Sequence, residues 1–324
     1  MFKTLSIVAV AWTFCLVVLG AYVRLSDAGL GCPDWPGCYG HPTPTQAQVE
    51  INAELAKNPN GPVSVEKAWK EIVHRMFAGG LVVLVAALAV LAIKQRDQLR
   101  RSPALSIAIV LLICLQAAFG AWTVTMKLRP VIVTTHLLLG LSTLGLLMWS
   151  AMRQRDWAPI PREAGSLRFP AAVGLIVLIC QIVLGGWTST NYAATACEDF
   201  PTCQGQLLPK MAFHNSFAVD RELGMAPDGS KLTMDNLRAI HWTHRVGALL
   251  TFCYLGWLAL RLYRRSVLRS LAVAVGLVLL VQIGLGIGNV LLHLPLPVAV
   301  MHNAGAALLL CLMIAMNYRL ARRR

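Results

Sequence analysis

Two stretches of the chain share one pattern: LGAYVRLSDAGLGCPDWPGC, Leu19–Cys38, and LGGWTSTNYAATACEDFPTC, Leu184–Cys203. Each begins at the end of an apolar segment and closes with Cys, acid, aromatic, Pro and Cys in the same order. The second stretch follows the first at an interval of half of the chain, which has 324 residues. A pattern that returns after half of the chain predicts a tandem duplication of one structural unit.

The composition predicts a membrane protein. Hydrophobic residues make up 56% of the chain and charged residues 14%, which is far from the average of soluble proteins. The first apolar run is long, contains Trp and Tyr and is poorly followed by a cleavage site, so we expect a transmembrane helix there and not a removable signal peptide. Eight runs approach or exceed the ~18 residues that cross a bilayer as a helix: about 3–23, 70–93, 103–126, 130–152, 169–191, 238–260, 270–292 and 297–318.

The fold class is therefore expected to be an all-α polytopic membrane protein with eight transmembrane helices. Each copy of the repeat holds four of them and one loop with a Cys pair, giving an N-terminal half at 1–168 and a C-terminal half at 169–324. Gln116 and Gln282, at nearly the same interval, extend the repeat. Four spans per half give both the same orientation, so we expect two tandem four-helix bundles related by a pseudo-twofold axis along the membrane normal.

The net charge of +14 is a topology signal. Basic residues gather after the second, fourth, sixth and eighth apolar segments, and the loops between are less basic. The positive-inside rule then places both termini in the cytoplasm, with the protein in the cell inner membrane, and argues against nucleic-acid binding. The long loops at about 24–69 and 192–237 face the outer, oxidising compartment, where cysteine pairs can form disulfides.

Four histidines recur at matching places inside the apolar segments. His244 corresponds to His74, and His302 corresponds to His136, at close to the interval that separates the Cys pairs. Each falls about five or six residues inside the outer end of its segment, roughly 8 Å deep at 1.5 Å per residue. Ionisable residues inside spans indicate a functional site. Hydrogen bonding between helices is the simpler alternative.

Two facing imidazoles in a helical bundle suit heme iron better than zinc. Zinc requires further ligands, and Glu71 is the one candidate, while copper stays open. A four-helix core admits a flat macrocycle ligated by histidines from facing helices. Arg75 and Arg245 directly follow two of the histidines and could pair with heme propionates. Reaching toward lipid head groups is an equal alternative for either arginine.

The halves differ at one informative position. Glu71 precedes His74 by three residues, so both lie on one side of a helix, whereas the residue that precedes His244 by three is His241. A buried carboxylate that can change protonation state is what proton-coupled oxidation needs nearby. The structural alternative is that Glu71 only bonds Arg75 or a helix end. The asymmetry indicates one catalytic half and one cofactor-holding half.

The combined motif set is distinctive: EIVHR at Glu71–Arg75, a later His136, HR at His244–Arg245, MHN around His302, and two outer Cys pairs on eight spans. Over essentially the whole chain this set resembles the heme A synthase family. The resemblance implies an oxidoreductase that converts heme O to heme A by oxidising a porphyrin methyl group, through an alcohol, to a formyl group.

The resemblance also implies two sets of site residues. The iron of a resident heme b would be held in the C-terminal half, by His244 and His302 with Arg245. The iron of the substrate heme would be held in the N-terminal half, by His74 and His136 with Arg75. Glu71 would be the catalytic residue.

The implied partners are heme O as substrate, membrane lipid, heme O synthase and cytochrome oxidase assembly factors. The electron acceptor leaves no motif, and self-association stays open. We expect disulfides within each loop, Cys32–Cys38 and Cys197–Cys203. A six-residue separation with an intervening Pro can bring the Cα atoms within the ~4.4–6.8 Å that a bridge needs.

Two rival functions remain. A two-heme cytochrome b-type electron carrier explains the four histidines equally well, but it does not explain Glu71 in one half only. A transporter with duplicated halves would place its site at the midplane, whereas all four histidines lie near one face.

Overall fold

The computed structural model describes residues 1–59, 61–99, 102–160 and 162–321. Within these ranges, eight helices are long and apolar enough to cross a membrane, which confirms the predicted all-α class with eight spans. The chain divides into two compact units, Met1–Leu147 and Met148–Arg324. The division into functional halves at 168/169 and the pseudo-twofold axis stay predictions.

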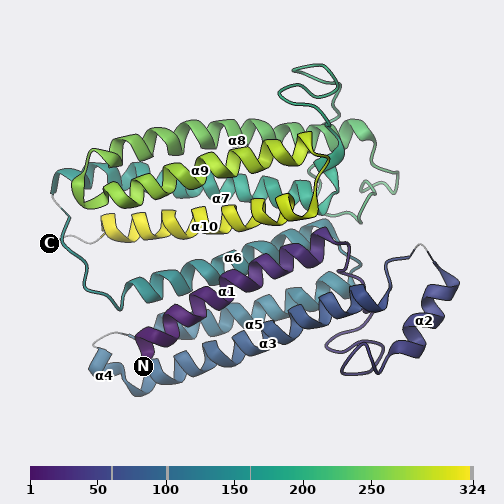
Figure 1. Cartoon of the computed structure of the whole chain (residues 1–324), viewed down its shortest axis with the longest axis horizontal. Coiled ribbons are helices and arrows are strands. Elements are labelled where there is room, and N and C mark those ends of the chain that lie inside the picture. Colours follow the sequence, from purple (N-terminus) through teal and green to yellow (C-terminus); the bar gives the residue numbers. More distant parts are fainter. Residues whose placement is uncertain (60, 100–101, 161, 322–324) are drawn as a thin grey trace. The chain divides into compact units, whose positions relative to one another are not determined.

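The first unit is built on four long helices, α1, α3, α5 and the greater part of α6 (Figure 1). α1 packs against α3, and α3 against α5. Their shared core takes side chains from all four, among them Ala9, Val85, Ile113 and Leu147. The helices of this stretch are α1 (Phe2–Leu25), α2 (Gln48–Lys57), α3 (Val65–Lys94), α4 (Arg96–Leu99), α5 (Ala104–Thr125) and α6 (Pro130–Met152).

The second unit is a four-helix bundle (Figure 1). α7 packs against α8, α8 against α9, α9 against α10, and α10 against α7, so the circuit of contacts closes. Gly174 lets α7 approach α8 and α10 closely, because a Cβ there would lie about 3 Å from Leu258 and Leu255 of α8 and Met313 of α10. The elements are η1 (Arg162–Leu167), α7 (Arg168–Thr190), η2 (Ala193–Thr195), α8 (Met234–Tyr263), η3 (Ser266–Leu268), α9 (Arg269–Leu291) and α10 (Leu296–Ala321).

Two helices begin earlier than their apolar runs predict. α3 begins at Val65, because the Ser64 hydroxyl accepts a hydrogen bond from the Lys67 N–H at 3.2 Å. α8 begins at Met234, because Thr233 and Asn236 form a capping box. These first turns are polar, so hydropathy does not detect them. They place Glu71 of α3 and His241 of α8 well inside continuous helix.

Candidate functional site

Each of the four predicted histidines packs its ring against a glycine of a neighbouring helix. A Cβ on that glycine would lie only 3.0 or 3.1 Å from the Cε1 atom of the ring. Any larger residue would therefore displace the imidazole. The pairs are Gly20 with His74, Gly120 with His136, Gly185 with His244, and Gly286 with His302.

Sequence reasoning missed these four glycines, although the repeat contained the signal. Gly185 follows Gly20 at the interval that separates the two Cys pairs. Gly286 follows Gly120 at the interval that separates His302 from His136. Glycine is common in membrane helices, so its meaning depends on the histidine that it faces across the bundle.

The histidines of each predicted pair come from helices of the same unit. His74 lies on α3 and His136 on α6 in the first unit, and His244 lies on α8 and His302 on α10 in the second. Each unit therefore contains both members of one predicted pair.

Glutamine side chains contact three of these rings. The side-chain nitrogen of Gln116 lies 3.4 Å from Nε2 of His136, and that of Gln282 lies 3.4 Å from Nε2 of His302. The sequence singled out Gln116 and Gln282 as a matched pair. The third contact, from Gln181 to His244, was not foreseen.

The donor set fits heme iron. Nδ1 of His74, His136 and His302 is buried without a hydrogen-bond partner among the described residues, as is Oε1 of Gln116 and Gln282. Buried polar atoms are normally satisfied, so unpartnered atoms around these rings indicate that the sites are incomplete without a bound group. The described part of the chain holds no group of three His, Cys, Asp or Glu able to bind a metal ion. A heme iron needs few ligands from the protein, so the two imidazoles of each pair would be enough to hold it.

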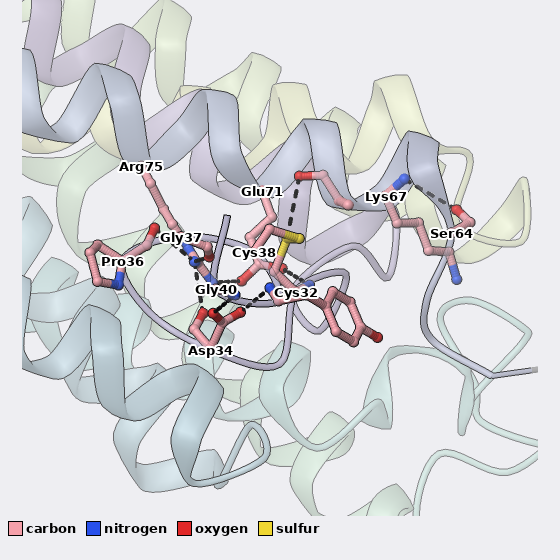
Figure 2. The surroundings of a disulfide bond; sticks show 12 residues. Cys32, Asp34, Pro36, Gly37, Cys38, Gly40, Ser64, Lys67, Glu71 and Arg75 are labelled. Carbon is pink, nitrogen blue, oxygen red and sulfur yellow. Dashed lines mark hydrogen bonds and ion pairs between the residues drawn. A yellow bond between two sulfur atoms is a disulfide. The ribbon is translucent and has the colours of Figure 1, made fainter. Parts of the chain in front are cut away.

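Glu71 and Arg75 hold the first Cys loop against α3. Glu71 is 4% exposed, and its two oxygens accept from different donors: Oε1 from Arg75 at 2.5 Å and Oε2 from the Cys32 N–H at 3.0 Å. Nη1 of Arg75 donates to the backbone oxygens of Asp34, Pro36 and Gly37 at 2.9, 3.1 and 2.6 Å (Figure 2). The structure therefore contains the contact with Arg75 that a purely structural role of Glu71 requires.

The second unit repeats this arrangement with a neutral partner. Nε of Arg245 donates to Nε2 of His241 at 3.2 Å, and the guanidinium also donates to the backbone oxygens of Thr202 and Cys197 at 2.7 and 3.1 Å. Both arginines thus bind backbone oxygens of a Cys loop. A role toward heme propionates stays a prediction for each of them. The charge of the partner residue, carboxylate or imidazole, is what distinguishes the two units here.

Both predicted disulfides are confirmed, Cys32–Cys38 and Cys197–Cys203, with Cα atoms 4.9 and 4.8 Å apart. Each bridge is followed by a tight turn with positive φ at both central residues, Tyr39–Gly40 and Gln204–Gly205, as in type I′ turns. Cys32 and Cys38 are fully buried and pack with Ile51 of α2. The first bridge therefore lies in a small core of its own.

An aspartate inside each Cys loop fixes the turn. Asp34 accepts from the N–H groups of Tyr39 and Gly40 at 2.6 and 2.7 Å. Asp199 accepts from those of Gln204 and Gly205 at 2.6 and 2.8 Å. The hydroxyl of Thr202 and these N–H groups lower the pKa of Asp199 from 3.8 to about 2. The acid in the shared motif is thus an acceptor for the backbone of the turn.

Comparison with known proteins gives one consistent family. The family model described as COX15-CtaA, cytochrome oxidase assembly protein, matches residues 3–314. Heme A synthase of Shewanella oneidensis is 43% identical over 96% of this chain and 94% of its own length. Heme A synthase of Caulobacter vibrioides is 26% identical over 97% of this chain and 94% of its own. Because both matches extend over nearly the whole chain, this protein belongs to the heme A synthase family, COX15-CtaA.

Proposed function

We propose that the protein has heme A synthase activity, oxidising a porphyrin methyl group of heme O through a hydroxymethyl group to the formyl group of heme A. One observation carries the proposal beyond family membership. Two histidine pairs stand in matched surroundings, but a carboxylate, Glu71, accompanies only one of them, and His241 takes its place in the other. Matched sites with unequal proton chemistry suit one catalytic site and one cofactor site.

In this proposal, His244 and His302 hold the iron of a resident heme b, with Arg245 nearby. Bound heme b supplies one-electron redox chemistry. His74 and His136 hold the iron of heme O, and the glycines that face these rings fix their orientation. Ligation of the iron alone leaves the macrocycle free to rotate about the bond to its ligands. Contacts to its edge, such as the one predicted between Arg75 and the propionates, would determine which methyl group is presented to Glu71, and orientation of this kind is a main contribution of a protein to cofactor chemistry.

Glu71 is the proton acceptor in this proposal. It lies one helical turn from His74, and it is shielded from water. Arg75 and the Cys32 N–H each donate a hydrogen bond to one of its oxygens. Each carboxylate oxygen has a second lone pair, so the group can accept a further hydrogen bond while the Cys loop stays attached.

The protein is a multi-pass membrane protein with eight candidate spans. The distribution of basic residues supports a location in the cell inner membrane, with both termini in the cytoplasm and both Cys loops on the outer side. Heme O arrives from the membrane, so heme O synthase and cytochrome oxidase assembly factors are proposed neighbours. Oxidising a methyl group to a formyl group takes up one oxygen atom, which water can supply, and releases four protons and four electrons. Glu71 would accept protons in turn, and a separate electron acceptor completes the reaction.

The test is heme analysis in cells that make heme O but lack heme A synthase activity of their own. Expression of the chain should convert extracted heme O to heme A, with some hydroxymethyl intermediate. A control with Glu71→Gln should leave heme O unconverted. If heme O persists with the unaltered chain while the purified protein holds two tightly bound hemes, the electron-carrier function is the correct one.

A further inference from the structure

The two units differ one helical turn before a heme-site glycine. Gly20 on α1 and Gly185 on α7 contact their histidines alike, each with its Cβ position 3.0 Å from Cε1 of the ring. Four residues before Gly185 the chain has Gln181, and four residues before Gly20 it has Leu16. A polar residue in the second unit therefore stands where the first unit has an apolar residue of similar size, which packs against that unit's core.

Gln181 holds the ring of His244 on the side away from Nε2. Its side-chain nitrogen lies 3.0 Å from Nδ1 of His244 and 3.1 Å from the backbone oxygen of the same residue. Gly247 leaves the space for this amide, because a Cβ there would collide with Oε1 of Gln181. In the first unit the residue that corresponds to Gly247 is Phe77, so that unit lacks both the glutamine and the glycine beside it.

This contact sets His244 apart from the other three histidines. Nδ1 of His74, His136 and His302 is buried and has no hydrogen-bond partner within the part of the chain that the structure describes. A histidine that binds metal through Nε2 carries a proton on Nδ1, and an acceptor for that proton fixes the ring and makes it a better ligand. In this structure the amide nitrogen of Gln181 donates to Nδ1 of His244, and its Oε1 is buried without a partner among the described residues. If the amide turns over, Oε1 becomes the acceptor at Nδ1 when that nitrogen carries a proton.

We propose that Gln181 is a positioning residue that makes His244 the anchoring ligand of the resident heme, and that Leu16 leaves His74 an exchangeable ligand at the substrate site. This rests on the proposed function. A resident cofactor must dissociate slowly, whereas the substrate site must release heme A after every cycle. The unequal support of two otherwise matched histidines meets both requirements.

The first experiment measures heme loss from the purified full-length protein to excess apomyoglobin. Losing such a second partner typically costs a metal site about 10–100-fold in affinity, so Gln181→Leu should release heme b about 10–100-fold faster. Gln181→Glu places an acceptor at Nδ1 without any turning of the side chain, so it should retain heme b and lower its reduction potential. Thr188→Val is the matched control on α7, because the Thr188 hydroxyl bonds the Leu184 backbone oxygen, at 2.8 Å, and not a histidine.

The reciprocal variant builds the same support in the first unit. Leu16→Gln combined with Phe77→Gly should slow the release of heme from the substrate site and change its low-spin electron paramagnetic resonance signal. The proposal would be overturned if Gln181→Leu lost heme b no faster than the unaltered protein. It would also be overturned if Gln181→Glu lost heme b as fast as Gln181→Leu. Undiminished heme b in His244→Ala would instead overturn the proposed function itself, so the two failures are distinguishable.

Discussion

Replacing Glu71 by histidine separates its two roles, because the second unit already uses histidine at that place. Glu71 accepts at 2.5 Å from Arg75 and at 3.0 Å from the Cys32 N–H. Hydrogen bonds to charged groups contribute about 1.5–3 kcal/mol each. A histidine in Glu71→His can accept from Arg75 as His241 accepts from Arg245, at 3.2 Å. The variant should therefore lose about one of the two hydrogen bonds, which lowers the free energy of unfolding by roughly 1.5–3 kcal/mol.

The activity should respond much more strongly than the stability. A general base contributes about 10²–10⁴-fold in rate. A neutral imidazole has one acceptor nitrogen, and in Glu71→His that nitrogen would bind Arg75, as His241 binds Arg245, so none is left to accept a proton. We expect heme A formation in Glu71→His to fall by about that factor, while the heme b spectrum stays that of the unaltered protein. The assay is the ratio of heme A to heme O in extracts, normalised to bound heme b, together with the thermal midpoint of the purified protein.

The matched control is Arg75→Ala, which releases the Cys loop but retains the carboxylate. Removing one partner of a buried ion pair costs about 3–5 kcal/mol, so this variant should lose more stability than Glu71→His. If Glu71→His forms heme A within tenfold of the unaltered protein, Glu71 is a structural residue. The asymmetry between the units would then no longer support a catalytic half.

Three further predictions concern the remaining parts of the molecule. His302→Ala should lower the heme b content of purified protein and change its absorption spectrum; an unaltered spectrum would reject this ligand. Gly185→Ala should also lower heme b content, because the new Cβ would lie 3.0 Å from Cε1 of His244, whereas full content would show that the ring can move aside. The folded-state pKa of Asp199, about 2, lies below the ordinary value of 3.8. The turn that Asp199 holds should therefore stay protected between neutral pH and about pH 4, and the stability that the carboxylate contributes should be lost as the pH falls toward 2. Hydrogen exchange at the amides of Gln204 and Gly205 measures this, and protection lost already near pH 6 would implicate another group.

Some features were predictable because they depend on composition or on the spacing of residues close in sequence. The eight spans follow from hydropathy, and the Cys32–Cys38 pairing follows from a short separation with an intervening Pro. The four histidines were found because the repeat places them at matching positions. The extra polar turn at the start of α3 was missed, since its signal is the Ser64 cap and not hydrophobicity.

The contacts that orient the site could not be predicted in the same way. Cys32 reaches Glu71 across 39 residues, and Gln181 reaches His244 across 63 residues. Such pairings depend on how two helices and a loop pack, and one sequence does not encode that packing in any local pattern. The repeat does limit which residues need comparing. Leu16 and Gln181 occupy matching positions, and the meaning of their difference becomes clear once the packing is known.

The division of labour between the two histidine pairs is tested most directly by mass analysis of the hemes bound to protein purified from cells that make heme O. We expect heme b together with heme O and its hydroxymethyl and formyl products, and we expect His302→Ala to remove heme b selectively. Two molecules of heme b per chain, with neither heme O nor heme A, would contradict that division of labour.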